Sequence, residues 1–372
     1  MVTMKQELKI ALYGAGSGGE LMEKNLQGSG VHVVVFFDSD PAKKGSFLNG
    51  IPIDVPGNHA KYDYDIIMIA STAVYEESIY STLRALHIPS ESIVPRTLLT
   101  NNIPSILSNY RNGECPDVCA SGMSYHRQAI IPQYSAHSIF NYAQTSMDIF
   151  YDYSMAKELL RDESETPKVW LIGLTYYSLH YDMSLSQPWT RVFYYKDLFG
   201  YHNLADNRKG YYLNDFDVPG LVTKFPHAVL QRVQDAEYTT QVLYNQRKVD
   251  CKTMDALSKK QAKADSNKDY PETVSENKYL LEKYVQLLVG RGIQPVFTLI
   301  PFPSVYPIGE ELFAEFFDYL KALENKYGCQ TINGYALTGY GDDCFYDVSH
   351  LNLQGGIKFT QYVDTFLNKY IS

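Results

Sequence analysis

The fold of the N-terminal part of the chain is decided by Leu8-Lys9-Ile10-Ala11-Leu12-Tyr13-Gly14-Ala15-Gly16-Ser17-Gly18-Gly19. Residues 8–13 are mostly apolar, as in a buried strand, and residues 20–27 favour a helix. Between them Gly14, Gly16 and Gly19 have the spacing G-x-G-x-x-G, which is informative only in this context of strand, turn and helix. Glycine permits a tight turn there and a close approach of other groups to the backbone. The stretch therefore predicts the first strand and helix of a parallel α/β sheet.

The next strand carries an acidic residue at its end. Residues 31–37 are apolar and lead into Asp38, where a carboxylate can bond ribose hydroxyls. Residues 63–70 and 92–95 read as further strands, and 73–86 as a helix. Because residues 1–100 are a short segment, we expect only two or three parallel strands there. A full dinucleotide-binding domain has six.

Three segments after the second strand carry a resemblance to a known class of domain. Phe36 to Pro41, then Lys44-Gly45 and residues 49–53, resemble the small Rossmann domains that precede nucleotide-sugar acetyltransferases and polysaccharide-synthesis dehydratases. The resemblance implies a nucleotide or nucleotide-sugar held by the glycine loop (Gly14, Gly16, Gly19) and Asp38. Two alternatives stay open. The glycines could serve only the close packing of helix on strand, and such modules often act as docking domains.

The remainder of the chain predicts a second α/β domain over residues 115–372, after a linker at 100–114 rich in Asn, Pro and Gly. Strands alternate with helices, which predicts a parallel sheet covered on both faces, a three-layer α/β/α arrangement. The expected strands are residues 118–123, 138–142, 169–177, 294–301 and 329–333, and the expected helices are 146–161, 275–290, 310–327 and 353–370. An insertion at about 182–273 fits either a lid over the strand ends or a dimerisation surface of a homo-oligomer.

Three polar residues are predicted to meet at the carboxyl end of this sheet. Asp347 and His350 lie three residues apart on the loop before the terminal helix. Ser124 follows the strand at 118–123, and Gly122 permits the tight turn that exposes its hydroxyl. An Asp that orients an imidazole beside a serine makes that serine a nucleophile. We therefore expect the Ser124 hydroxyl to lie about 2.6 to 3.2 Å from the His350 ring.

These two segments resemble the first and last sequence blocks of the SGNH (GDSL-type) hydrolase superfamily, although Met123 replaces the family's Asp. The resemblance covers roughly residues 115–372 and is closest to the divergent SGNH-like proteins of polysaccharide and teichoic acid modification. It implies a flavodoxin-type sheet, and chemistry that requires neither a cofactor nor a metal.

The resemblance also implies donors for an oxyanion. Ser124 N–H is the first, Ala143 N–H or the Asn141 amide the second, and the Thr175 hydroxyl replaces the family's Asn as the third. Asn352 is expected to bond the loop that carries His350. Tyr125 and His126 follow the nucleophile and are expected to line the pocket, and the alternative for His126 is an exposed position at the start of a helix.

Composition excludes several partners. A formal charge of −9 disfavours nucleic acid and anionic membranes, because phosphate binding needs concentrated Lys and Arg. Without an apolar run of 18 residues we expect no transmembrane segment and a cytoplasmic protein. The five cysteines form no paired framework and are interpreted as reduced thiols. The 32 tyrosines suit a carbohydrate-binding surface, or reflect composition bias.

The sequence thus predicts a serine esterase or O-acyltransferase, with the acyl donor left open. Its substrate would be a glycan, glycan precursor or nucleotide-sugar of cell-surface polysaccharide synthesis. The competing hypothesis is a catalytically inactive SGNH-fold protein of binding or assembly. A nicotinamide oxidoreductase is disfavoured, because the first domain is short and no hydride-transfer partner is recognisable.

Overall fold

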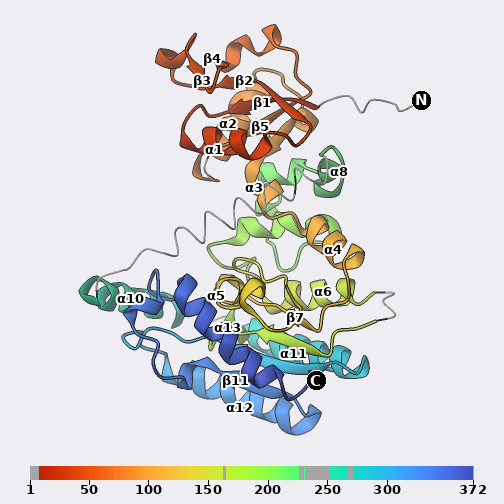
Figure 1. Ribbon diagram of the computed structural model, residues 1–372, viewed down its shortest axis with the longest axis vertical. Helices are drawn as coiled ribbons and strands as arrows, with labels where there is room; N and C mark the ends of the chain where they lie inside the picture. The colour runs from red at the N-terminus through yellow and green to blue at the C-terminus, as the bar shows by residue number, and fades with distance from the viewer. Residues whose placement is uncertain are drawn as a thin grey trace. The chain divides into compact units, whose positions relative to one another are not determined.

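A computed structural model describes residues 8–71, 73–161, 165–225, 230, 251–266 and 271–371. The chain divides into two units, and the second contribution to unit 1 comes from within the expected insertion (Figure 1). Unit 1 comprises Met1–Ser105 and Ala205–Thr240, and unit 2 comprises Ile106–Leu204 and Gln241–Ser372. Both units are α/β.

Unit 1 contains a six-stranded mixed sheet in the order β3-β4-β2-β1-β5-β6. Five strands are parallel, and only β3 runs antiparallel to its neighbour β4. The strands are β1 (Leu8–Tyr13), β2 (Val31–Phe37), β3 (Phe47–Leu48), β4 (Ile51–Asp54), β5 (Ile66–Ile69) and β6 (Ile93–Pro95). The expectation of two or three strands was wrong. The β3–β4 hairpin turns at Asn49-Gly50, where both residues have positive φ, and this dipeptide is a strong hairpin signal.

One helix occupies most of the linker that was expected at residues 100–114. In unit 1 the helices are α1 (Ser17–Leu26), α2 (Ala73–Ala85), α3 (Arg96–Thr100) and α8 (Val218–Thr223), and the linker helix α4 (Ile103–Asn112) begins in unit 1 and continues into unit 2. Residues 100–114 are largely helical because Asn102 Oδ1 accepts the Ser105 N–H at 3.1 Å, and Ile103, Leu107 and Tyr110 bury one face. Pro104 does not break the helix, since proline is tolerated in a first turn.

Unit 2 contains a five-stranded parallel sheet in the order β11-β10-β9-β7-β8. Numbered within the unit, this is 2-1-3-4-5, the flavodoxin-type order of doubly wound sheets. The strands are β7 (Val118–Ala120), β8 (Ile139–Asn141), β9 (Val169–Gly173), β10 (Gln294–Leu299) and β11 (Gln330–Asn333). They match the expected positions but are shorter at their ends, because the last residues of three predicted strands form the turns that carry the site.

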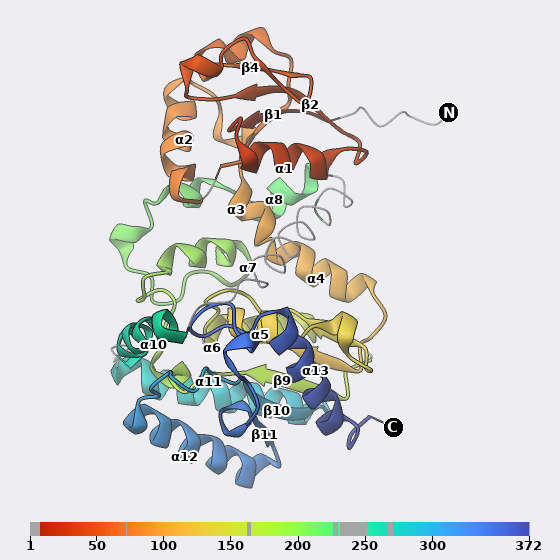
Figure 2. The ribbon, with the colours of Figure 1, turned by 60° about the vertical axis from the view of Figure 1, so that its left-hand side comes forward.

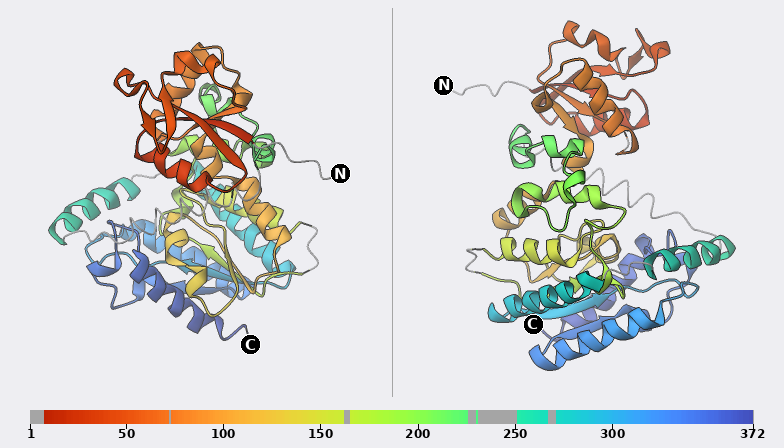
Figure 3. Two further views of the ribbon diagram at one scale, coloured as in Figure 1. Left: turned by 45° about the horizontal axis from the view of Figure 1, so that its top comes forward. Right: turned by 180° about the vertical axis from the view of Figure 1, so that it is seen from behind.

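Helices cover this sheet in two groups. One group pairs α5 (Ser124–Ala129) with α13 (Leu353–Leu367). In the other, α11 (Pro271–Gly290) packs against α6 (Ile149–Leu159), α12 (Glu310–Tyr327) and strand β10 (Figures 2 and 3). The described remainder adds α7 (Lys196–Phe199) and α10 (Cys251–Ser266).

The insertion is shared between the units. Within unit 1, Tyr212 donates to the buried Glu76 at 3.1 Å, and Tyr80 donates to Asp215 at 2.6 Å. Residues 182–204 and α10 belong to unit 2 instead. Residues 226–229, 231–250 and 267–270 of the insertion lie outside the described residues. Among the helices that the structure describes, none has the length and apolarity needed to cross a bilayer.

Candidate active site

A sharp turn after β7 presents Ser124 as the first residue of α5. Gly122 has φ +114°, a conformation that residues with a side chain rarely adopt. A Cβ on Gly122 would lie 2.6 Å from His126 Nδ1 and 2.8 Å from Gly173 Cα at the end of β9. Glycine is therefore required twice here, for the turn and for the close packing of β7 and β9.

Ser124, His350 and Asp347 form a continuous chain of hydrogen bonds. Ser124 Oγ lies 2.9 Å from His350 Nε2, within the expected range. His350 Nδ1 lies 2.9 Å from Asp347 Oδ2. Asp347 Oδ1 also accepts the backbone N–H groups of Ser349 and His350, at 2.9 and 2.8 Å. The carboxylate thus fixes both the loop and the imidazole ring.

The surroundings keep Asp347 ionised and hold His350 in place. Burial alone would raise the pKa of Asp347, but the hydrogen bond and charge of His350 and two backbone N–H groups lower it below its usual value. The His350 ring contacts Tyr125 and Tyr346, with ring centroids 4.6 and 5.4 Å away. An ionised Asp347 can stabilise a positive charge on His350.

A cavity of about 590 Å³ opens above Ser124 and His350. Its walls come partly from the insertion, through residues that the sequence did not single out as functional. They are Ser186, Arg191, Gln261 and Asp265. Tyr177 and Tyr181, from the turn after β9, also line it. Tyr177 lies at the third strand end, where the sequence predicts polar side chains that could bind a sugar hydroxyl, whereas only the predicted overhang of the insertion pointed to the insertion residues.

The residues expected as oxyanion donors are engaged elsewhere. The Asn141 amide donates to the carbonyls of His126 and Ile130, and Ala143 N–H donates to Asn141 Oδ1 at 3.0 Å. The Thr175 hydroxyl is buried 3.1 Å from Ser178 Oγ. None of the three lines the cavity as described. Asn141 thus fastens α5, and Thr175 pairs with Ser178, so the oxyanion role of these three residues stays a prediction.

Two further expectations concern loop residues. Asn352 donates to the Asp343 carbonyl at 2.5 Å and accepts the Gly355 N–H at 2.9 Å, so it ties the loop of His350 to the start of α13. His126 is fully buried, not exposed, and its Nε2 lies 2.8 Å from the Thr298 carbonyl. Burial lowers the pKa of His126 to about 4, so its ring is neutral.

In unit 1, some glycines of the loop are tightly packed and others have open space beside them. A Cβ on Gly19 would lie 1.9 Å from the Gly14 carbonyl oxygen, whereas a Cβ on Gly16 would meet nothing within 4 Å. Asp38 Oδ2 accepts the Ala15 N–H at 2.9 Å and the Lys43 ammonium at 2.7 Å. Partial burial would raise the pKa of Asp38, but these contacts and the Asp40 N–H lower it. The Asp38 carboxylate therefore holds the glycine loop in place, and this role does not depend on a ligand.

One comparison with known protein families matches the N-terminal part of the chain. A family model described as C2185-like, N-terminal, matches residues 6–94. The solved structure of UDP-D-quinovosamine 4-dehydrogenase from Vibrio fischeri is similar at 26% identity over 24% of this chain and 77% of that chain, with a TM-score of 0.21. No curated protein matches the sequence.

Proposed function

We propose that unit 2 is an SGNH-like serine esterase or O-acyltransferase that acts on a glycan, a glycan precursor or a nucleotide-sugar. The observation that carries the proposal is the unbroken hydrogen-bond chain from Ser124 through His350 to Asp347. The strand order of unit 2 and the turn at Gly122 support it, because both place the serine at the carboxyl end of the sheet.

In the proposed reaction, Ser124 Oγ attacks the acyl carbonyl carbon while His350 Nε2 takes the hydroxyl proton. Asp347 stabilises the resulting imidazolium. The tetrahedral intermediate collapses to an acyl-serine, and His350 returns the proton to the departing alcohol oxygen. Water or an acceptor hydroxyl then attacks the acyl-serine, with the same proton transfers through His350, and regenerates the free serine.

The developing oxyanion is assigned to the start of α5. The first N–H groups of a helix have no partner within it and carry partial positive charge, so Ser124 N–H is a donor at the right place. Thr145 and Ser146 line the same cavity and supply two hydroxyls. They replace Asn141, Ala143 and Thr175 as the groups to test for a second donor.

The cavity lining supports a polar, hydroxyl-rich substrate. Tyr177, Tyr181, Gln261 and Asp265 offer rings that stack on sugars, together with groups that bond hydroxyls. Arg191 adds a cation, which suits a substrate with an anionic group such as the diphosphate of a nucleotide-sugar.

Hydrolysis of p-nitrophenyl acetate tests the proposal. Ser124→Ala should abolish turnover without unfolding the protein, whereas Ser138→Ala, at an exposed serine of the same unit, should retain it. Equal activity of wild type and Ser124→Ala would place the nucleophile elsewhere. A wild-type protein inert towards a broad panel of esters would favour the non-catalytic binding or assembly protein.

A second function is proposed for unit 1, the binding of a nucleotide or nucleotide-sugar. It is favoured by Gly16, which precedes the ten-residue helix α1 and has open space where a side chain would be. Backbone N–H groups at a helix start bind phosphate, and a glycine without a packing role leaves room for one.

A further inference from the structure

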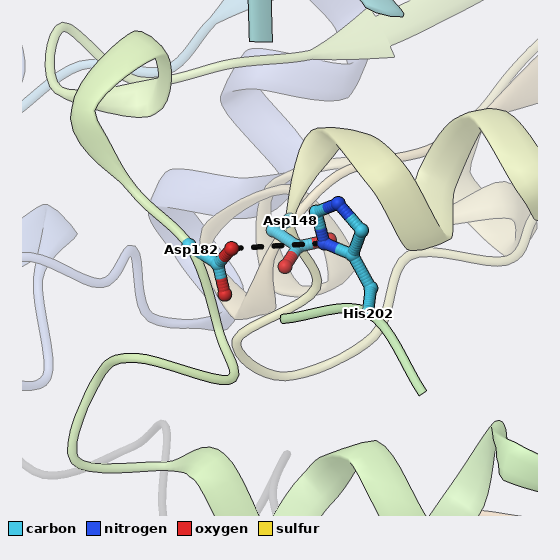
Figure 4. Close-up of side chains that lie close together, drawn as sticks. All are labelled: Asp148, Asp182 and His202. Carbon is cyan, nitrogen blue, oxygen red and sulfur yellow. Dashed lines mark ion pairs between the residues drawn. The ribbon is translucent and has the colours of Figure 1, made fainter. Parts of the chain in front are cut away.

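Three buried side chains of unit 2 lie close together and take no part in the proposed reaction. Asp148 precedes α6, Asp182 follows the turn after β9, and His202 lies beyond α7. One potential ligand atom from each lies within 4.8 Å of the others (Figure 4). Asp148 and Asp182 are 3% and 1% exposed, and the His202 side chain is 10% exposed.

The distance between His202 and Asp182 fits two ligands of one ion better than a hydrogen bond. His202 Nδ1 lies 3.6 Å from Asp182 Oδ2, and this buried nitrogen has no hydrogen-bond partner among the described residues. A hydrogen bond between nitrogen and oxygen is normally no longer than about 3.2 Å. Two ligands at about 2.1 Å from a tetrahedral ion lie about 3.4 Å apart.

The opposite side of the imidazole has the partner that a metal-binding histidine usually has. His202 Nε2 lies 3.0 Å from Glu276 Oε1 on α11, so the carboxylate accepts the proton there. Donation from Nε2 leaves the lone pair of the neutral ring on Nδ1, facing the two aspartates. The ring is also stacked on Phe150, with centroids 3.9 Å apart.

Both aspartates are oriented by backbone donors. Asp148 accepts the N–H groups of Tyr151 at 3.0 Å and Met183 at 2.9 Å. Asp182 Oδ1 accepts the Ser184 N–H at 2.7 Å, and its Oδ2 accepts the Asn203 amide at 2.8 Å. Asp182 Oδ1 also accepts the Leu185 N–H at 3.2 Å, whereas Asp182 Oδ2 and the two Asp148 oxygens accept one bond each and keep a lone pair for an ion.

Among the described residues, the charge of the two aspartates is not balanced by a lysine or an arginine. No Lys or Arg forms an ion pair with Asp148 or Asp182 in the described part of the chain. Buried carboxylates are normally paired or bound to a metal.

We propose that Asp148, Asp182 and His202 bind one divalent first-row transition ion, of which Zn²⁺ and Mn²⁺ are the best candidates. Two carboxylate oxygens and one imidazole nitrogen suit these ions, and Glu276 supplies the outer contact that orients the histidine. This site is distinct from the serine chemistry and does not depend on it.

The ion would stabilise the cavity wall. Asp148 lies two residues after Ser146, and Asp182 follows Tyr181; both Ser146 and Tyr181 line the cavity. Tyr181 donates to the Ser146 carbonyl at 2.9 Å, which already joins these two segments. An ion bound by Asp148 and Asp182 would link the same two segments a second time.

Metal content and melting temperature of the full chain test the proposal. After stripping with EDTA and reloading with Zn²⁺ or Mn²⁺ followed by desalting, the wild type should retain one ion per chain by mass spectrometry. Its melting temperature should rise on reloading, because an ion that binds only the native state stabilises it. His202→Gln and Asp182→Asn should both lose the ion and the shift.

His180→Gln is the matched control, since His180 Nε2 also contacts a carboxylate, Glu315, at 2.7 Å but belongs to no such cluster. It should bind the ion as the wild type does. Circular dichroism checks that each variant is folded, and Asp148→Asn replaces any variant that is not. Retention of neither ion by the wild type, or unchanged retention by folded cluster variants, would overturn the proposal.

Discussion

At the scale of single residues, Asp347 has two roles that one substitution can separate. Its Oδ1 accepts the backbone N–H groups of Ser349 and His350, and its charge faces the imidazole. The amide of an asparagine keeps an oxygen for the backbone bonds but removes the charge. The loop and the chemistry therefore respond differently to the same change.

Asp347→Asn should lower kcat for p-nitrophenyl acetate by about 10²- to 10⁴-fold, as expected when the group that stabilises an imidazolium is lost. The melting temperature should change little, because the loop contacts remain. Steady-state kinetics and a thermal melt on the same sample check both parts. Activity within a few-fold of the wild type would mean that Asp347 only shapes the loop.

Site residues could be predicted from the sequence where their spacing in the chain determines that they meet. Asp347 and His350 are three residues apart, and Ser124 lies at a strand end, so the topology of a parallel sheet brings them together. Asn141, Thr175 and His126 depend on which way a side chain turns beyond a short strand. That direction is set by tertiary packing, for instance by the Thr298 carbonyl that His126 contacts.

At the scale of elements, the turn between β7 and α5 depends on Gly122. Gly122→Ala should destabilise the protein by about 1 to 3 kcal/mol, since it combines a strained φ with a clash against His126 and Gly173. Gly290→Ala is the matched control: a Cβ there meets nothing within 4 Å, and the change should stay within about 1 kcal/mol. Urea unfolding measures both. Equal stability of the two variants would mean that the turn relaxes freely.

The bounds of helices and strands could be predicted where a long apolar pattern marks them. The prediction failed where a capping residue or a turn sets the bounds. Helix α12 has the bounds that its sequence predicts, Glu310–Tyr327. The helix α4 was missed because Asn102 and Pro104 read as a linker, although Asn is a favoured N-cap residue. Strands β3 and β4 are two and four residues long, which is too short for a periodic pattern. Their only signal in the sequence is the Asn49-Gly50 turn.

At the scale of the whole molecule, the sequence predicted two α/β domains but could not predict that the insertion is divided between them. Residues 205–240 belong to unit 1, where Tyr212 and Asp215 bond Glu76 and Tyr80. Such pairings join residues about 135 positions apart, and no local pattern encodes them. The group of Asp148, Asp182 and His202, proposed to bind a metal ion, was missed because no local pattern joins these three residues.

Each unit is expected to have a ligand site of its own, and a thermal shift with variants of each unit can separate the two sites. A nucleotide or nucleotide-sugar should raise the melting temperature of the wild type, because it binds the native state. Gly16→Val should remove the shift by blocking the approach of phosphate, and Asp38→Ala should weaken it. Ser124→Ala should leave it unchanged. No shift with any nucleotide of a broad panel would identify unit 1 as an assembly domain instead.

The central claim is that His350 and Asp347 make Ser124 a nucleophile, and covalent labelling tests it most directly. The full chain is incubated with a fluorophosphonate, and the adduct is located by intact-mass measurement and peptide mapping. We predict one adduct per chain, on Ser124, absent from Ser124→Ala and formed far more slowly by His350→Ala. Labelling of another residue, or equal labelling of the wild type and His350→Ala, would contradict the account.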